Sequence, residues 1–205
     1  MAVKSKFAFR DLNETAKETA RYRLLKKMEK LSWQEKAISQ FVFDAGKIGV
    51  IVIPGSVRFS EDSASFSASD VNLPVVLDYS GIGRKFLSAR EDFDLFCAFT
   101  TAAIRQVFPE SPNAQLLSVS VEMDSLNNID GGRLGAVFDI AADYLERYLK
   151  TLALTLSCHL HRLLLSEYER MSSRSVLDGI LETMGRVFTE DGDWETSISF
   201  ITDNR

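Results

Sequence analysis

One stretch of helical periodicity limits the folds that are open to this chain. Between Leu134 and Met171 the apolar residues recur at spacings of three and four. The residues in register are Val137, Ala141, Tyr144, Tyr148, Leu152, Leu156, Leu160, Leu163 and Leu164. This spacing predicts one long helix, or two helices joined at a kink, that packs across a sheet.

Two further helices are expected before residue 49. Asn13 is a good N-cap residue, and an apolar residue follows at every fourth position, so the first helix runs to about Lys30. The four residues Ser32–Glu35 have the pattern of a capping box, which predicts the start of a second helix. Its core face is Trp33, Ala37, Phe41 and Ala45, and it ends at Gly46 or Gly49.

Strand patterns occupy residues 50–70. Val50–Ile53 is a β-branched run that ends at the turn Pro54-Gly55, and a second strand is expected over Val57–Ser60. From Ser63 to Ser69 small apolar residues and serines alternate, which predicts one antiparallel strand whose serines face solvent. The region is therefore a meander or a pair of hairpins.

The rest of the chain mixes helices and strands. Residues 73–90 are expected to form a loop or short helical turns. We predict helices over 91–108 and 173–184, strands over 115–123 and 186–189, and a loop over 127–132. The predicted fold class is α+β, with a small antiparallel sheet packed against several helices, including one long helix in the C-terminal half. We expect a single domain over 1–205, with a basic helical part (1–49) and a sheet-and-helix body (50–205).

The charge of the chain is unevenly distributed. The net charge is −5, but residues 1–60 carry 12 Lys and Arg against 6 Asp and Glu, and the remaining residues carry 12 against 23. A basic head on an acidic body can steer a charged partner. The N-terminus has no apolar segment of a secretory signal, and the longest apolar stretch, 151–165, is too short and too polar to span a membrane. We therefore expect a cytoplasmic protein, with Cys97 and Cys158 as buried free thiols.

The sequence gives no catalytic constellation. His159 and His161 are two positions apart, so they cannot form a metal pair on one helix face. Acidic residues cluster at Glu61-Asp62, at 91–94 and at 190–193, where helix starts and turns explain them. We expect no catalytic residue, no metal and no other cofactor.

Four stretches carry motifs in a defined order. They are Asp11–Arg21, Phe43–Gly49, Phe59–Ala68, and Glu167–Ser173 running on to Val187–Gly192. Together they resemble a family of uncharacterised bacteriophage and prophage proteins over nearly the whole chain, and some members of that family are labelled as the antitoxin of a toxin–antitoxin stability system. The family's hairpin glycines are replaced here. The resemblance implies phage ancestry and an α+β fold, and it supplies no catalytic residues.

These features favour a small non-enzymatic phage protein that binds a host macromolecule and inhibits a bacterial defence component, in an anti-CRISPR-like or similar way. The partner-binding residues expected for a host or defence-system protein are Arg58, Phe59, Glu61, Asp62, Glu190 and Asp191. The alternative is a nucleic-acid-binding antitoxin or regulator that uses the first helix. Its candidate residues are Lys17, Arg21, Lys26, Lys27 and Lys30. A third hypothesis is a metal-dependent hydrolase built from the acidic turns.

Overall fold

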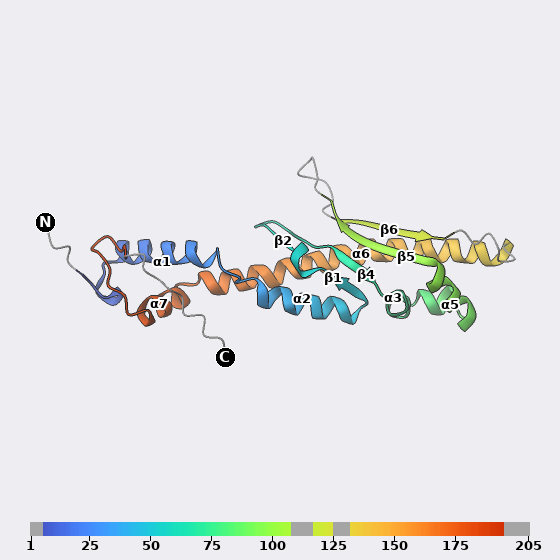
Figure 1. Cartoon of the computed structure of the whole chain (residues 1–205), viewed down its shortest axis with the longest axis horizontal. Coiled ribbons are helices and arrows are strands. Elements are labelled where there is room, and N and C mark those ends of the chain that lie inside the picture. Colours follow the sequence, from blue (N-terminus) through green and yellow to red (C-terminus); the bar gives the residue numbers. More distant parts are fainter. Residues whose placement is uncertain (1–5, 108–116, 125–131, 195–205) are drawn as a thin grey trace. The chain divides into compact units, whose positions relative to one another are not determined.

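The computed structural model has an α+β fold and describes residues 6–107, 117–124 and 132–194 (Figure 1). Its helices, in chain order, are η1 (Phe9–Asp11), α1 (Glu14–Met28), α2 (Glu35–Lys47), η2 (Pro54–Ser56), α3 (Leu73–Ser80), α4 (Ile82–Phe86), α5 (Arg90–Phe99), α6 (Gly132–Ser172) and α7 (Arg174–Thr183). Its strands are β1 (Val50–Val52), β2 (Arg58–Phe59), β3 (Ala64–Ser65), β4 (Ala68–Val71), β5 (Thr100–Gln106) and β6 (Leu117–Met123). The predicted fold class is thus confirmed.

The chain is organised into two compact units. Unit 1 comprises Met1–Trp33 and Ser166–Arg205, and unit 2 comprises Gln34–Leu165. The long helix α6 is one continuous helix, and it contributes residues to both units. The prediction of one long helix in the C-terminal half is therefore confirmed.

Unit 1 is built around helices α1 and α7. The side chain of Asn13 accepts a hydrogen bond from the Ala16 amide at 2.9 Å, so the predicted N-cap of α1 is confirmed. The buried residues of this unit are Phe9, Leu12, Ala16, Ala20, Leu24, Leu177, Leu181, Phe188 and Trp194. The strand predicted over 186–189 is wrong, because the described backbone there forms only an isolated antiparallel bridge between Phe188 and Phe7.

Unit 2 contains a long irregular hairpin. Strand β1 pairs with β4, and β2 pairs with β3 inside that pair, both antiparallel. The tip closes where the Ser60 amide donates to the Ser63 carbonyl at 2.9 Å. The prediction of hairpins over 50–70 is confirmed, and the two strand pairs share one turn.

The hairpin corrects the prediction of a single alternating strand over 63–69. The segment is split between β3 and β4, which have different partners, and Ser65 is buried. Its hydroxyl accepts a hydrogen bond from Gln106 Nε2 at 3.0 Å, and the same nitrogen donates to the Ser56 carbonyl at 2.7 Å. The side-chain amide of Gln106 thus gives the Ser65 hydroxyl and the Ser56 carbonyl the hydrogen-bond partner that they would otherwise need from water.

The helix predicted over 91–108 is wrong beyond Phe99. At Thr100 the chain turns into strand β5, which pairs with β6 over the seven residue pairs from Thr100–Met123 to Gln106–Leu117. Pairing across the chain overrides the local helical pattern here. Strand β6 agrees with the predicted strand over its described residues, whereas residues 115 and 116 and most of the predicted 127–132 loop lie outside the described ranges.

Three local predictions have different outcomes. The short helical turns considered for 73–90 are confirmed as α3 and α4. The capping box at Ser32–Glu35 is wrong, because α2 begins at Glu35 behind a helical Gln34 and has no side-chain cap. Both cysteines are free, but Cys97 is only half-buried and Cys158 is exposed.

Over the described ranges, every helix is too short or too polar to cross a bilayer.

Candidate functional site

The four candidate residues of the hairpin tip lie together in unit 2. Arg58 Nη1 donates to the carbonyls of Gly55 and Val57 at 3.2 and 3.0 Å, which turns the guanidinium back onto its own loop. The Phe59 ring packs against His161 with 5.8 Å between ring centroids. The carboxylates of Glu61 and Asp62 are exposed at the tip.

The two other acidic candidates belong to unit 1. Glu190 and Asp191 are exposed in the turn that the Gly192 amide closes by donating to the Thr189 carbonyl at 2.9 Å. The six predicted partner-binding residues are thus divided between the two units, four in unit 2 and two in unit 1.

The basic candidates on and after α1 differ in their surroundings. Lys26 Nζ is 2.8 Å from Glu29 Oε2, which forms an ion pair. Lys27 Nζ lies 4.8 Å from the centre of the Trp194 ring, and Lys30 is exposed. Lys17 is half-buried on α1. Lys26 and Lys30 are thus exposed, whereas Lys17 and Lys27 are half-buried.

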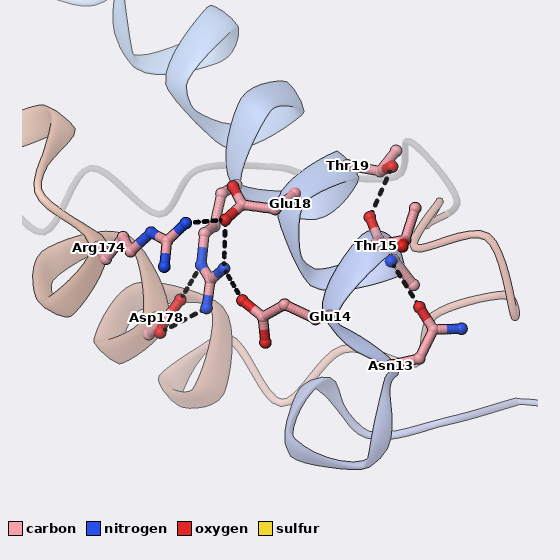
Figure 2. A network of polar contacts seen from close by, with 9 residues as sticks. Asn13, Glu14, Thr15, Glu18, Thr19, Arg174 and Asp178 are labelled. Atoms are coloured by element: carbon pink, nitrogen blue, oxygen red, sulfur yellow. Dashed lines mark hydrogen bonds and ion pairs between the residues drawn. The ribbon is translucent and has the colours of Figure 1, made fainter.

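Arg21 is different, because its guanidinium is buried in a network of carboxylates (Figure 2). Figure 2 shows Glu14, Glu18 and Asp178 pointing toward the space between α1 and α7. Arg21 donates from Nε and Nη2 to Asp178 at 2.6 and 2.9 Å, and from Nη1 to Glu14 and Glu18 at 2.8 and 3.1 Å. The hydrogen bonds to Asp178 and Glu14 raise the pKa of Arg21, and the bond from Arg21 lowers the pKa of Asp178. This arginine joins α1 to α7, and we leave it out of any nucleic-acid site.

The sequence analysis did not recognise an aromatic surface on unit 2. We use this name for the side chains of Tyr79 on α3, Lys85 and Phe86 on α4, and Tyr144 and Tyr148 on α6. The Phe86 and Tyr144 ring centroids are 4.8 Å apart, and Lys85 Nζ lies 4.9 Å from the first and 4.5 Å from the second. Tyr79 is 68% exposed and Tyr144 is 43% exposed.

Tyr144 and Tyr148 correct an earlier expectation. Their helical spacing predicts that they lie on the core face of α6 together with Ala141, but only Ala141 is buried there, and Leu145 and Leu149 take the positions expected for the tyrosines. Tyr148 is half-buried, and burial together with the nearby Tyr79 raises the pKa of its hydroxyl. The sequence carried no signal for this surface, because the spacing of Tyr144 and Tyr148 fits the core face of a helix.

The histidines have local partners. His159 Nε2 lies 3.3 Å from Asp44 Oδ2, and His161 Nε2 lies 3.0 Å from the Glu61 carbonyl oxygen. Among the residues whose placement is described, no three His, Cys, Asp or Glu side chains gather closely enough to hold a metal ion.

Known proteins add no further information on the site. The resemblance to phage proteins stays a prediction, since comparison with protein-family models, curated proteins and solved structures gives no match for this chain.

Proposed function

We propose that this chain is a non-enzymatic binding protein whose aromatic surface docks on a partner protein. The observation that supports this proposal is the group of aromatic side chains around the Phe86–Tyr144 ring contact, in which Tyr79 and Tyr144 are exposed to solvent. Contiguous exposed apolar groups are uncommon on monomeric proteins and mark interaction sites.

The chemistry of the aromatic surface suits a protein partner. A tyrosine offers a large apolar face and a hydroxyl, and it loses little conformational entropy on binding because it has few rotatable bonds. Lys85 already lies against two of the rings, so part of the cost of ordering its side chain has been met before a partner arrives. Such groups dominate the binding energy of protein interfaces.

The kind of partner follows from the resemblance to phage proteins. We propose a bacterial host protein, and specifically a component of a defence system that the bound chain inhibits. The hairpin tip with Arg58, Phe59, Glu61 and Asp62 is a second surface of the same unit that such a partner can contact.

The test is a capture experiment followed by reconstitution. The tagged chain is used as bait in a bacterial lysate, and the captured protein is purified and titrated against wild type and three variants. These are Y79A/Y144A on the aromatic surface, E61K/D62K on the hairpin tip, and L154A as a control for an exposed apolar residue elsewhere on α6.

We expect the double tyrosine variant to weaken binding by at least about 2 kcal/mol, roughly thirtyfold in Kd, and the control to bind like wild type. Loss of binding in E61K/D62K alone would move the interface to the hairpin tip. Equal binding by wild type and Y79A/Y144A, or the lack of any stoichiometric partner, would contradict the proposal.

A further inference from the structure

Unit 1 contains a pocket with basic walls, separate from the aromatic surface of unit 2. Its volume is about 300 Å³. One wall comes from α1 and the turn after it, with Arg23, Lys26, Lys27 and Lys30, and the other comes from Asp193 and Trp194. We call this site the basic pocket.

The charges of the basic pocket are only partly neutralised. Arg23 forms an ion pair with Asp193, and Lys26 forms one with Glu29. Lys27 and Lys30 have no carboxylate within ion-pair distance among the residues that the structure describes. Two positive charges on the same wall therefore remain available.

The remaining wall offers an apolar face. Trp194 is only 6% exposed, and its Nε1–H is buried without an acceptor among the described residues. The Lys27 ammonium lies over the ring of this tryptophan. Ammonium groups can only donate hydrogen bonds, so Lys27 and Lys30 suit a ligand that brings acceptors, whereas the carboxylate of Asp193 in the same pocket is paired with Arg23.

The lowered pKa of Lys27 also favours an anionic ligand. Burial lowers the pKa of its ammonium, and the nearby charges of Arg186 and Arg23 lower it further. A bound anion would offset both effects, because an opposite charge nearby favours the protonated form of a lysine.

The free donors favour phosphate over carboxylate. One nitrogen of the Arg23 guanidinium, a group whose fork would match a planar carboxylate, is already engaged by Asp193. What remains are two ammonium groups, which act as point charges and are common phosphate ligands. Tyr22, which also lines the pocket and is 62% exposed, provides a ring on which a base can stack.

From these observations we propose that the basic pocket binds the phosphate group of a nucleotide, with Lys27 and Lys30 as its ligands. The phosphate can belong to a free nucleotide or to a nucleic-acid strand, since the chemistry at the lysines is the same. The competing explanation is that these lysines only compensate the partial negative charge at the C-terminal end of α1.

Trp194 gives a direct signal for the test. The chain has two tryptophans, and W33F leaves Trp194 as the sole one while it keeps an aromatic ring against Tyr168. The full-length W33F protein is titrated at constant ionic strength with inorganic phosphate, adenosine monophosphate, a single-stranded DNA oligonucleotide and, as the carboxylate control, acetate.

We expect a saturable change in Trp194 emission with the phosphate probes and none with acetate. K27Q and K30Q in the same background should each raise Kd about tenfold, whereas the matched control K36Q, on α2 and outside the pocket, should leave it unchanged. K30Q keeps the test decisive if K27Q disturbs the packing against Trp194, because Lys30 is exposed.

The probes also separate the two sources of phosphate. Equal affinity for the monophosphate and the oligonucleotide indicates a nucleotide site, whereas much tighter oligonucleotide binding that falls steeply with salt indicates a nucleic-acid strand. An unchanged Trp194 signal with every phosphate probe, an equal response to acetate, or a Kd that K27Q and K30Q leave unaltered would overturn the proposal. A lower Tm of both variants without any phosphate response would support the role in charge compensation instead.

Discussion

At the scale of single residues, Arg21 determines how α1 is held in unit 1. Its side chain is 8% exposed, and it contacts carboxylates of both α1 and α7. A permanent charge in such a place is stable only while its partners neutralise it, and removal of the arginine leaves a cluster of three carboxylates that repel each other.

We expect R21A to lower the free energy of unfolding by about 3 kcal/mol, since breaking a largely buried ion pair is strongly destabilising. R174A is the matched control, because Arg174 also binds Glu18 but its side chain is 73% exposed, and its loss should cost less than about 1 kcal/mol. Urea unfolding followed by tryptophan fluorescence measures both, because Trp33 and Trp194 both belong to unit 1. A similar loss in the two variants would contradict the role of Arg21.

The same network makes unit 1 sensitive to acid. The hydrogen bond from Arg21 holds the pKa of Asp178 below its ordinary value of 3.8 in the folded state. A lowered folded-state pKa contributes stability that is present above the unfolded-state pKa and is lost as the pH falls through the folded-state value. We expect urea stability to fall below about pH 4 and this fall to be smaller in D178N. An identical pH profile in D178N would count against this linkage.

The role of Arg21 shows what sequence could not provide at this scale. The basic character of the residue is obvious in the sequence, and it was assigned to a nucleic-acid site for that reason. Its main partner, Asp178, is 157 positions away, and no local pattern connects the two. The N-cap Asn13 was predictable because its partner, the Ala16 amide, is three residues away.

At the scale of elements, the junction of α5 and β5 shows where periodicity becomes ambiguous. Thr100 and Ile104 are both buried, and a spacing of four residues fits one face of a helix as well as one face of a strand. The pairing of β5 with β6 decides between them, and that information lies in another part of the chain. The helical pattern up to Phe99 was therefore predictable, whereas its end was not.

The turn after Thr189 fixes the C-terminal segment of unit 1 against α1. Gly192 has a φ of +79°, and a Cβ atom there would lie 2.0 Å from the Ala16 carbonyl oxygen. We expect G192A to destabilise the protein by about 3 kcal/mol through backbone strain and the clash together.

The control for this substitution is G185A. Gly185 also has a positive φ of +58°, but nothing lies within 4 Å of the Cβ position, so only the backbone term of about 1 kcal/mol is expected. Fluorescence-detected urea unfolding compares the two variants. Equal stability of G192A and G185A would show that the turn does not pack against α1 as described.

At the scale of the whole molecule, the two units differ in the number of chain segments that form them. Unit 2 is one continuous stretch with its own large buried rings, Phe41, Phe66, Phe96 and Phe138. Unit 1 needs two segments from opposite ends of the chain, because the apolar face of α1 is covered by α7. The division was not predictable from the sequence, because the change of charge near residue 60 and the expected boundary at residue 49 both fall inside unit 2.

We expect a fragment of residues 34–165 to fold alone, because its core is complete without the terminal segments. A fragment of residues 1–165 should show the same cooperative thermal transition while α1 stays unfolded, since its partner α7 is missing. Circular dichroism and hydrogen exchange measure helix content and protection in both fragments. Protected α1 amides in the longer fragment, or a non-cooperative melt of the shorter one, would disprove this assignment.

The two cysteines give the molecule a built-in attachment point. Burial raises the pKa of the Cys97 thiol and so suppresses its thiolate, whereas Cys158 is exposed on α6. A maleimide dye should therefore label unit 2 at one defined position without any engineering. In the W33F background, energy transfer from Trp194 in unit 1 to the dye on Cys158 in unit 2 depends on the distance between the two residues. It therefore reports in solution whether a captured partner or a bound phosphate changes that distance.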